Sequence, residues 1–184
     1  MISKRLNILL ISLLVVSCAV WPVYGQQQRV SEYQVKAAFL YNFAKFVEWP
    51  KSVDAGASKQ LVLGILGKDP FGEDIKTIQD KRVKDRTLQV IRAEHLEELG
   101  NCDILFIGAS MKGQLDSTLK ELDGKPVLTV SDTRGFAQQG VMINLFTINN
   151  KIRFEINLQA VEQSGLKISS QLLKLATLVK SERQ

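Results

Sequence analysis

The sequence predicts an α/β domain of three layers, built on a mainly parallel sheet with an antiparallel hairpin at its C-terminal edge. Short, continuous apolar runs alternate with amphipathic stretches through the middle of the chain, an order typical of parallel strands joined by right-handed crossovers. After residue 140 this alternation stops, and two strand-like runs flank Asn149-Asn150, a pair typical of a tight hairpin turn. An aromatic-rich segment before the first strand adds a helix.

The first helix is predicted to begin after Ser31. Ser31 and Gln34 have the spacing of a capping box, and Val30 and Val35 are placed as its hydrophobic staple. At helical spacing the run forms two apolar faces with a thin polar strip. The first face is Val35, Ala38, Phe39, Phe43, Phe46 and Val47, and the second is Tyr33, Ala37, Leu40, Tyr41 and Ala44. The polar strip is Lys36, Asn42 and Lys45. A helix that is apolar almost all round is either buried on both sides or reserved for a partner. We expect a core role for most of these side chains.

The remaining elements follow from apolar runs and stop signals. We expect strands at 61–66, 87–91, 102–107, 127–130, 141–148 and 151–157, helices at 71–80, 94–99, 114–122 and 170–179, and loops at 54–58 and around residue 165. For the final helix, Ile168 and Leu173 are expected to form the staple, and its buried face is expected to consist of Leu172, Leu175, Ala176 and Val179.

The first 25 residues have the plan of a secretory signal peptide. Lys4 and Arg5 precede an uncharged apolar core at 6–16, and Val23 and Gly25 supply the small residues of a cleavage site before Gln26. Two alternatives are lipidation at Cys18 and an uncleaved membrane anchor. We expect export, with 1–25 as the signal peptide and 26–184 as a single domain.

Charge and cysteine content narrow the function further. Removing 1–25 takes away two of the 24 Lys and Arg residues and none of the 19 Asp and Glu residues, which leaves a net charge of +3. So small a charge, without a basic cluster, argues against a nucleic-acid partner. Cys102 is then the only thiol, so no internal disulfide can form, and we expect a small buried side chain at the start of a strand.

No pattern in the sequence indicates catalysis. The single histidine, His95, lies in a predicted surface connection, and no metal-ligand spacing, phosphate-binding loop or nucleophile elbow is present. We expect no catalytic residue, no cofactor and no metal site.

Polar residues gather where the predicted parallel strands end, and this is the edge at which such sheets bind ligands. Ser131 and Asp132 follow the 127–130 strand, and Arg153 and Asn157 share the polar face of the last hairpin strand. These four residues are the candidate ligand-binding site, although turn chemistry alone would account for Ser131 and Asp132.

The aromatic run at 35–50 resembles the opening of the YfiR-like family of exported bacterial proteins. Further blocks of resemblance follow in order at 102–108, 126–132, 135–136, 140–144, 153–158 and 165–173. The resemblance implies a periplasmic Rossmann-like domain, often a homodimer. It also implies a repressor that binds the periplasmic sensor region of an inner-membrane diguanylate cyclase, lowering cyclic di-GMP and biofilm formation. Family members of this type carry disulfides, and this chain keeps only Cys102 of those cysteines.

Two hypotheses of function follow. In the first, Tyr41, Phe46 and Trp49 form an apolar patch that docks on the cyclase sensor or a related membrane protein. In the second, the domain is a periplasmic small-molecule-binding module, accessory to another membrane signalling protein, and a ligand in the crevice near Asp132 shifts a partner equilibrium. An uncharacterised hydrolase is a third and weaker interpretation.

Overall fold

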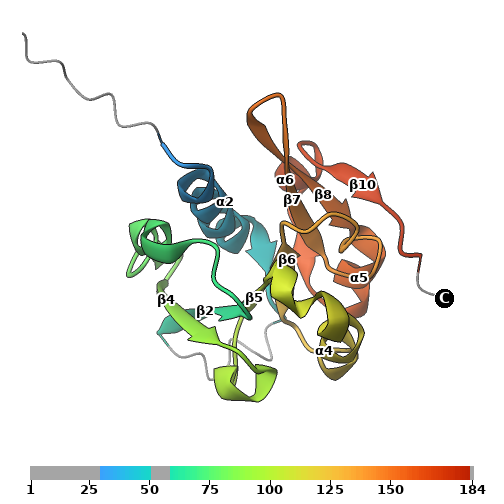
Figure 1. Ribbon diagram of the computed structural model, residues 1–184, viewed down its shortest axis with the longest axis horizontal. Helices are drawn as coiled ribbons and strands as arrows, with labels where there is room; N and C mark the ends of the chain where they lie inside the picture. Colours follow the sequence, from blue (N-terminus) through green and yellow to red (C-terminus); the bar gives the residue numbers. More distant parts are fainter. Residues whose placement is uncertain (1–29, 51–58, 183–184) are drawn as a thin grey trace, which may run out of the picture.

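The computed structural model describes residues 30–50 and 59–182 of the chain (Figure 1). The predicted signal peptide, Cys18 and the loop at 54–58 lie outside the described residues. Of the helices within the described ranges, none combines the length and the hydropathy that crossing a bilayer requires.

Eight strands form one sheet in the order β10-β8-β7-β6-β5-β2-β4-β3. The pairs β4–β2, β2–β5, β5–β6, β6–β7 and β8–β10 are parallel, whereas β3–β4 and β7–β8 are antiparallel. The mainly parallel α/β fold with a C-terminal antiparallel hairpin is thus confirmed. Bounds of the strands in this sheet are β2 Gln60–Leu66, β3 Arg82–Val83, β4 Arg86–Ala93, β5 Ile104–Ile107, β6 Leu128–Ser131, β7 Ile143–Ile148, β8 Lys151–Asn157 and β10 Thr177–Val179.

Helices and short 3-10 turns cover both faces of this sheet (Figure 1). One core cluster lies between the sheet and α2, and a second lies between the sheet and α4 with the turns beside it. The elements outside the large sheet are the helices α2 Glu32–Phe46, α4 Leu115–Glu121, α5 Leu158–Gln163 and α6 Ser170–Leu173, the 3-10 turns η1 Gly72–Thr77, η2 Leu96–Leu99 and η3 Ala109–Gln114, and the antiparallel pair β1 Val47–Glu48 and β9 Lys167–Ile168.

Helix α2 begins as predicted, because the Ser31 side chain accepts a hydrogen bond from the backbone N–H of Gln34. Its buried face differs from both predicted faces and centres on Ala37, Leu40, Phe43 and Ala44. The predicted polar strip is wrong at Lys36, which is only 5% exposed.

The hairpin turn at Asn149-Asn150 is confirmed, with φ values of 50° and 57° that suit asparagine in a type I′ turn. In Figure 1 the β7–β8 hairpin extends past the other strands, on the side where α2 begins. The two elements are joined there, because Thr147 Oγ1 donates to Glu32 Oε1 at 2.9 Å.

The predicted helix at 170–179 is wrong. Helix α6 makes a single turn, capped by Ser169, and the chain then continues as β10. Strand β10 pairs in parallel with Glu155–Asn157 of β8, so the outer edge of the hairpin gains backbone hydrogen bonds that a longer helix would have left unmade. Leu172 is buried as predicted, whereas Leu175 is 71% exposed. Helix α5, which starts directly after β8, was not predicted.

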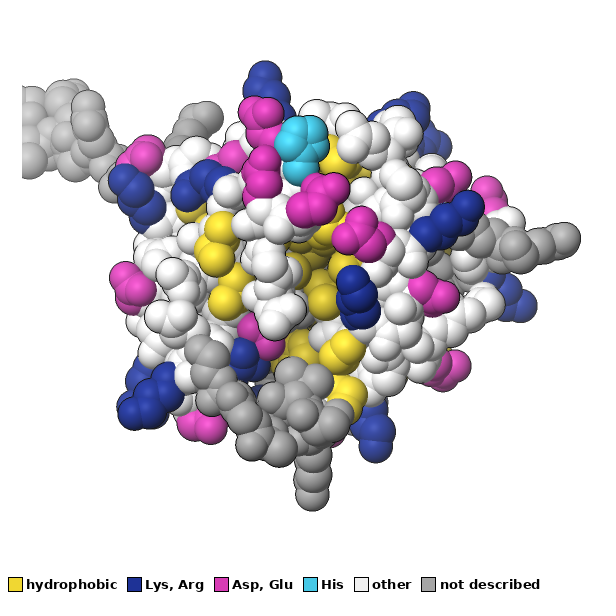
Figure 2. All heavy atoms as spheres, turned by 90° about the horizontal axis from the view of Figure 1, so that it is seen from below, with side chains coloured by type: hydrophobic (Ala, Val, Ile, Leu, Met, Phe, Trp, Pro, Cys, Tyr) yellow, Lys and Arg dark blue, Asp and Glu magenta, His cyan; other side chains and the backbone are white. Residues whose placement is uncertain are grey.

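The second face of the sheet carries only short elements, and several of its apolar side chains stay partly exposed. Ile91, Leu96, Cys102, Leu119 and Leu122 pack on the smaller core cluster without being fully covered. Figure 2 shows hydrophobic side chains gathered in the hollowed middle of one face, with charged side chains and the single histidine around them.

We predict that Phe43→Ala strongly destabilises the fold. The Phe43 ring is fully buried, and its centroid lies 5.2 Å from that of Phe154 and 5.9 Å from that of Phe39. Truncating a buried phenylalanine costs about 3–5 kcal/mol of unfolding free energy, measurable by urea denaturation. The control Ile148→Ala, at a side chain 52% exposed, should cost less than about 0.5 kcal/mol. Equal losses in the two variants would contradict this account of the core.

Candidate functional site

The carboxyl end of β6 is shaped by its last residue. Ser131 is fully buried, and its hydroxyl donates to the carbonyl of Ile107 at 2.8 Å while accepting from the backbone N–H of Thr133 at 3.2 Å. These two bonds turn the chain out of the sheet and fix the position of the next side chain, Asp132.

Asp132 meets the first helix. Its Oδ2 accepts from Lys36 Nζ at 2.7 Å and from the Tyr33 hydroxyl at 3.0 Å. Lys36 also forms a salt bridge with Glu32 at 2.7 Å, one turn earlier on α2. The Lys36 and Asp132 side chains are only 6% and 9% exposed. A buried ion pair therefore joins α2 to the end of β6 across 96 residues of sequence.

The pKa values of Lys36 and Glu32 are both shifted. Burial is the largest single influence and would lower the pKa of Lys36, but the hydrogen bonds to Asp132 and Glu32, together with the charge of Asp132, leave the pKa raised. The pKa of Glu32 is lowered, chiefly by its hydrogen bond from Lys36 and then by that from Thr147. Both groups are thus held in their charged forms at neutral pH.

A cavity of about 910 Å³ opens beside this ion pair. Its walls come from the start of α2, the loop after β6, strands β7 and β8, and the chain after β10. The lining residues are Glu32, Lys36, Asp132, Arg134, Gly135, Gln138, Gln139, Asn144, Phe146, Thr147, Ile148, Glu155 and Glu182. The cavity lies at the carboxyl end of a parallel strand, which is where the sequence analysis expected a ligand to bind. Ligand binding there stays a prediction.

The four predicted ligand residues are not all brought together. Asp132 lines the cavity, whereas Ser131 and Asn157 are fully buried with internal partners. Asn157 caps α5 by accepting from the backbone N–H of Ala160 at 3.1 Å, and its Nδ2 donates to the carbonyl of Ala137 at 2.8 Å. Arg153 is exposed on β8, opposite Phe146 in the hairpin. A ligand-contacting role for these residues stays a prediction.

Sequence reasoning missed several polar residues of the cavity wall, among them Lys36, Gln138 and Asn144. A signal for Lys36 was available, because it lies four residues after Glu32 on a helix that is otherwise largely apolar. Asn144 and Gln138 had no such signal, because the pairing of β7 with β6 places Asn144 opposite Ser131 and the loop after β6 places Gln138.

The three predicted partner-binding residues are half-buried and pack against the main core. The Tyr41 hydroxyl donates to the carbonyl of Arg82 in β3 at 2.8 Å, and the ammonium groups of Lys45 and Lys81 lie 4.4 Å and 5.6 Å from its ring centroid. Phe46 comes five residues after Tyr41 and so about 140° further round the helix. Its backbone carbonyl accepts from the backbone N–H of Ser169 at 3.0 Å.

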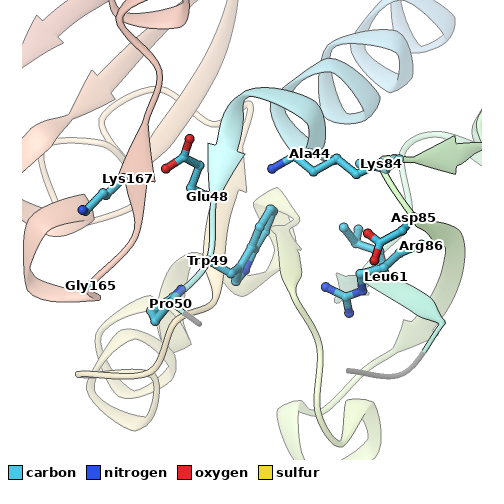
Figure 3. Close-up of a pocket in the computed structure, with 11 residues that line it drawn as sticks. Ala44, Glu48, Trp49, Pro50, Leu61, Lys84, Asp85, Arg86, Gly165 and Lys167 are labelled. Atoms are coloured by element: carbon cyan, nitrogen blue, oxygen red, sulfur yellow. The ribbon is translucent and has the colours of Figure 1, made fainter. Parts of the chain in front are cut away.

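Trp49 occupies a second cavity, of about 600 Å³. Figure 3 shows its ring projecting from the end of β1 into the space beside Lys84, Asp85 and Arg86. Its indole Nε1 is buried and has no hydrogen-bond acceptor among the described residues. Tyr41 and Trp49 therefore both lie beside the β3–β4 edge of the sheet, and Phe46 lies apart from them.

The remaining chemically active side chains lie apart from these cavities. His95 is exposed at the start of η2. Burial, and then the nearby charge of Asp103, raises the pKa of the Cys102 thiol to about 11. Among the described residues, no group of three or more His, Cys, Asp or Glu side chains could hold a metal ion.

Together, the parallel sheet, the cavity at its carboxyl edge and the half-buried aromatic residues on α2 define a Rossmann-like domain suited to binding. The chain belongs to the YfiR/HmsC-like family, whose sequence model matches residues 33–177. This confirms the resemblance seen in the sequence. The family is regulatory and non-catalytic, and membership supports a regulator of diguanylate cyclase in the periplasm.

We predict that Lys36→Met destabilises the fold by about 3–5 kcal/mol, because it leaves the Asp132 carboxylate buried without its cation. The double variant Lys36→Met, Asp132→Leu should recover much of this loss, since an apolar replacement of a buried pair is often neutral. Urea denaturation of the two variants and the wild type forms the comparison. A double variant as unstable as the sum of both single variants would contradict the pairing.

The pH dependence of stability offers a second prediction. Because the pKa of Glu32 is lowered from 4.5 in the fold, its stabilising contribution is present above that pH and is lost as the pH falls through the lowered pKa. Because the pKa of Lys36 is raised, its contribution is lost only at strongly alkaline pH. Thermal unfolding measured as a function of pH should show a smaller loss of stability at acid pH in Lys36→Met than in the wild type. An equal loss in the two proteins would contradict the assignment of this stabilisation to the pairing of Glu32 with Lys36.

We also predict that Cys102 is a slow nucleophile. With a pKa of about 11, very little of the thiol is ionised at pH 8, and its alkylation by iodoacetamide should be at least about tenfold slower than that of free cysteine. Denaturation in urea should restore the ordinary rate. A native rate equal to that of free cysteine would contradict the burial of this thiol.

Proposed function

We propose that the protein is a periplasmic repressor that docks on the sensor region of an inner-membrane diguanylate cyclase. In this proposal residues 1–25 direct export and the domain at 26–184 acts in the periplasm, lowering cyclic di-GMP and biofilm formation. The observation that carries the proposal is the family match, which spans 33–177 and so includes α2 and the whole sheet down to the start of β10.

The docking surface is proposed to lie beside the β3–β4 edge and to centre on Tyr41 and Trp49. Both are large amphipathic side chains that are half-buried and already held in place, Tyr41 by its bond to Arg82 and Trp49 by the walls of its cavity. Aromatic residues of this kind supply much of the binding energy at interfaces, because little rotamer entropy is lost when they are covered. Phe46 is a flanking contact.

Charge supports a particular kind of partner surface. Lys45 and Lys81 lie over the Tyr41 ring, and both are exposed. A partner that places an acidic rim around an apolar centre would pair with these ammonium groups and cover the ring. The same surface could mediate the homodimer that the family resemblance implies, and size-exclusion chromatography of the variants below would reveal such a dimer.

Repression is tested by measuring cellular cyclic di-GMP with the gene present, deleted and restored. Deletion should raise cyclic di-GMP, and the wild type should lower it again. The variant Tyr41→Ala, Trp49→Ala should fail to do so, because each truncation is expected to cost about 2 kcal/mol or more of docking energy.

Two variants serve as controls. Leu175→Ala removes an exposed side chain in the connection between α6 and β10, and this variant should restore repression as the wild type does. Tyr41→Phe keeps the ring and loses only the bond to Arg82, which separates docking from local stability. Full repression by a folded Tyr41→Ala, Trp49→Ala protein would rule out docking through these residues.

A second candidate function is favoured by the cavity at the carboxyl end of β6. In this alternative the protein is a periplasmic small-molecule-binding module, accessory to another membrane signalling protein. The support is the size of the cavity, about 910 Å³, together with the polar residues in its wall. Binding there could accompany repression, because Lys36 connects the cavity to α2.

A further inference from the structure

The cavity beside the Lys36–Asp132 pair has a buried polar group without a partner. Asn144 is only 2% exposed and lines the cavity from β7. Its Nδ2 donates to Glu155 Oε1 at 3.3 Å, and since a carboxylate can only accept, this bond fixes which end of the amide is the carbonyl. Asn144 Oδ1 then has no donor among the described residues.

A second amide lies in the cavity wall. Gln138 Oε1, from the loop after β6, is also buried without a donor among the described residues. A buried carbonyl oxygen without a hydrogen bond is costly, and Asn144 Oδ1 is the acceptor whose identity a printed bond fixes. The cavity therefore favours a ligand that brings N–H donors.

The charged residues that line the cavity indicate the charge of that ligand. The acidic residues are Glu32, Asp132, Glu155 and Glu182, and the basic ones are Lys36 and Arg134. Lys36 is already paired with Glu32 and Asp132, and Arg134 and Glu182 are both exposed. Arg134, Glu155 and Glu182 form no salt bridge among the described residues, so their net charge is −1. Glu155 is the carboxylate bonded to Asn144, so the charge next to Asn144 is negative and favours a cation.

The part of the lining nearest the hairpin turn is apolar. Phe146 and Ile148 follow Asn144 on the same face of β7, and Ile148 is 52% exposed. Phe146, the nearer of the two, offers an apolar surface to a methylene group beside Asn144.

We propose that this cavity binds a small aliphatic diamine, a methylene chain with a primary ammonium group at each end. One ammonium donates to Asn144 Oδ1 and pairs with Glu155, and the other lies toward Gln138 and Glu182, whose backbones are joined by a hydrogen bond. The methylene chain spans the space between these two ends, and Phe146 flanks the end at Asn144. This proposal deepens the ligand-binding alternative and is independent of docking through Tyr41 and Trp49.

Calorimetric titration of the purified exported protein with 1,4-diaminobutane tests the proposal. We expect saturable binding of one equivalent. Binding of 1,4-butanediol, which has the same chain without charge, and of succinate, its anionic counterpart, should each be at least about tenfold weaker. Potassium chloride at matched ionic strength controls for screening.

Three variants locate the site. Asn144→Leu and Glu155→Gln should each weaken diamine binding about tenfold, by removing an acceptor or a charge. Glu73→Gln removes an exposed carboxylate on η1 that pairs with Lys76, and its affinity should be unchanged. If Asn144→Leu does not fold, Glu155→Gln alone still tests whether the diamine binds in this cavity.

The proposal is overturned by three outcomes: no saturation with the diamine, equal binding of the diol or succinate, or wild-type affinity in folded Glu155→Gln. Because binding is measured on the isolated protein, its failure leaves the cyclic di-GMP experiment unaffected. A protein that binds diamine but does not repress would instead overturn only the docking proposal.

Discussion

The buried pair between Lys36 and Asp132 is the contact on which the arrangement of this domain depends. Apolar packing is non-directional and would by itself tolerate sliding or rotation of a helix that is apolar on most sides. The 2.7 Å bond from Lys36 to a carboxylate fixed at the end of β6 is a buried directional contact that favours one rotation of α2. The exposed bonds of Tyr41 to Arg82 and of Thr147 to Glu32 agree with that rotation. With that rotation set, Phe43 faces the core, Tyr41 reaches β3, and Glu32 meets Thr147 on the hairpin.

The two candidate sites lie at opposite ends of the same helix, and this placement connects them. The start of α2 forms one wall of the cavity beside Lys36 and Asp132, and its last turns lead through β1 to Trp49. Coupling between two sites needs an element that both of them contact, and α2 is that element here. If both proposals hold, a ligand in the cavity would act on docking at Tyr41 and Trp49 through this helix.

Local patterns in the sequence predicted the parallel sheet and the hairpin. The central strands β2 and β5 are continuous apolar runs, β8 alternates polar with apolar residues, and the turn residues suit positive φ. Long-range pairing overrode them elsewhere. Leu172, Leu175, Ala176 and Val179 have helical spacing, yet the free edge of β8 draws Thr177–Val179 into the sheet. Lys36 was placed in a solvent-facing strip because its carboxylate partner comes 96 residues later. Of the candidate site, Asp132 could be predicted from the end of a parallel strand, whereas Asn144 required the pairing of β7 with β6 and Gln138 required the folded loop.

The central claim is that Tyr41 contacts a diguanylate cyclase in the cell. The most direct measurement is site-specific photo-crosslinking, with a benzophenone amino acid in place of Tyr41 and, in a second strain, in place of the exposed Leu175. Mass spectrometry then identifies the partner in each crosslinked product. The account predicts a crosslink from position 41 to the periplasmic region of an inner-membrane diguanylate cyclase, and none to that protein from position 175. A crosslink from position 41 only to a second copy of this chain, or equal crosslinking from both positions, would contradict it.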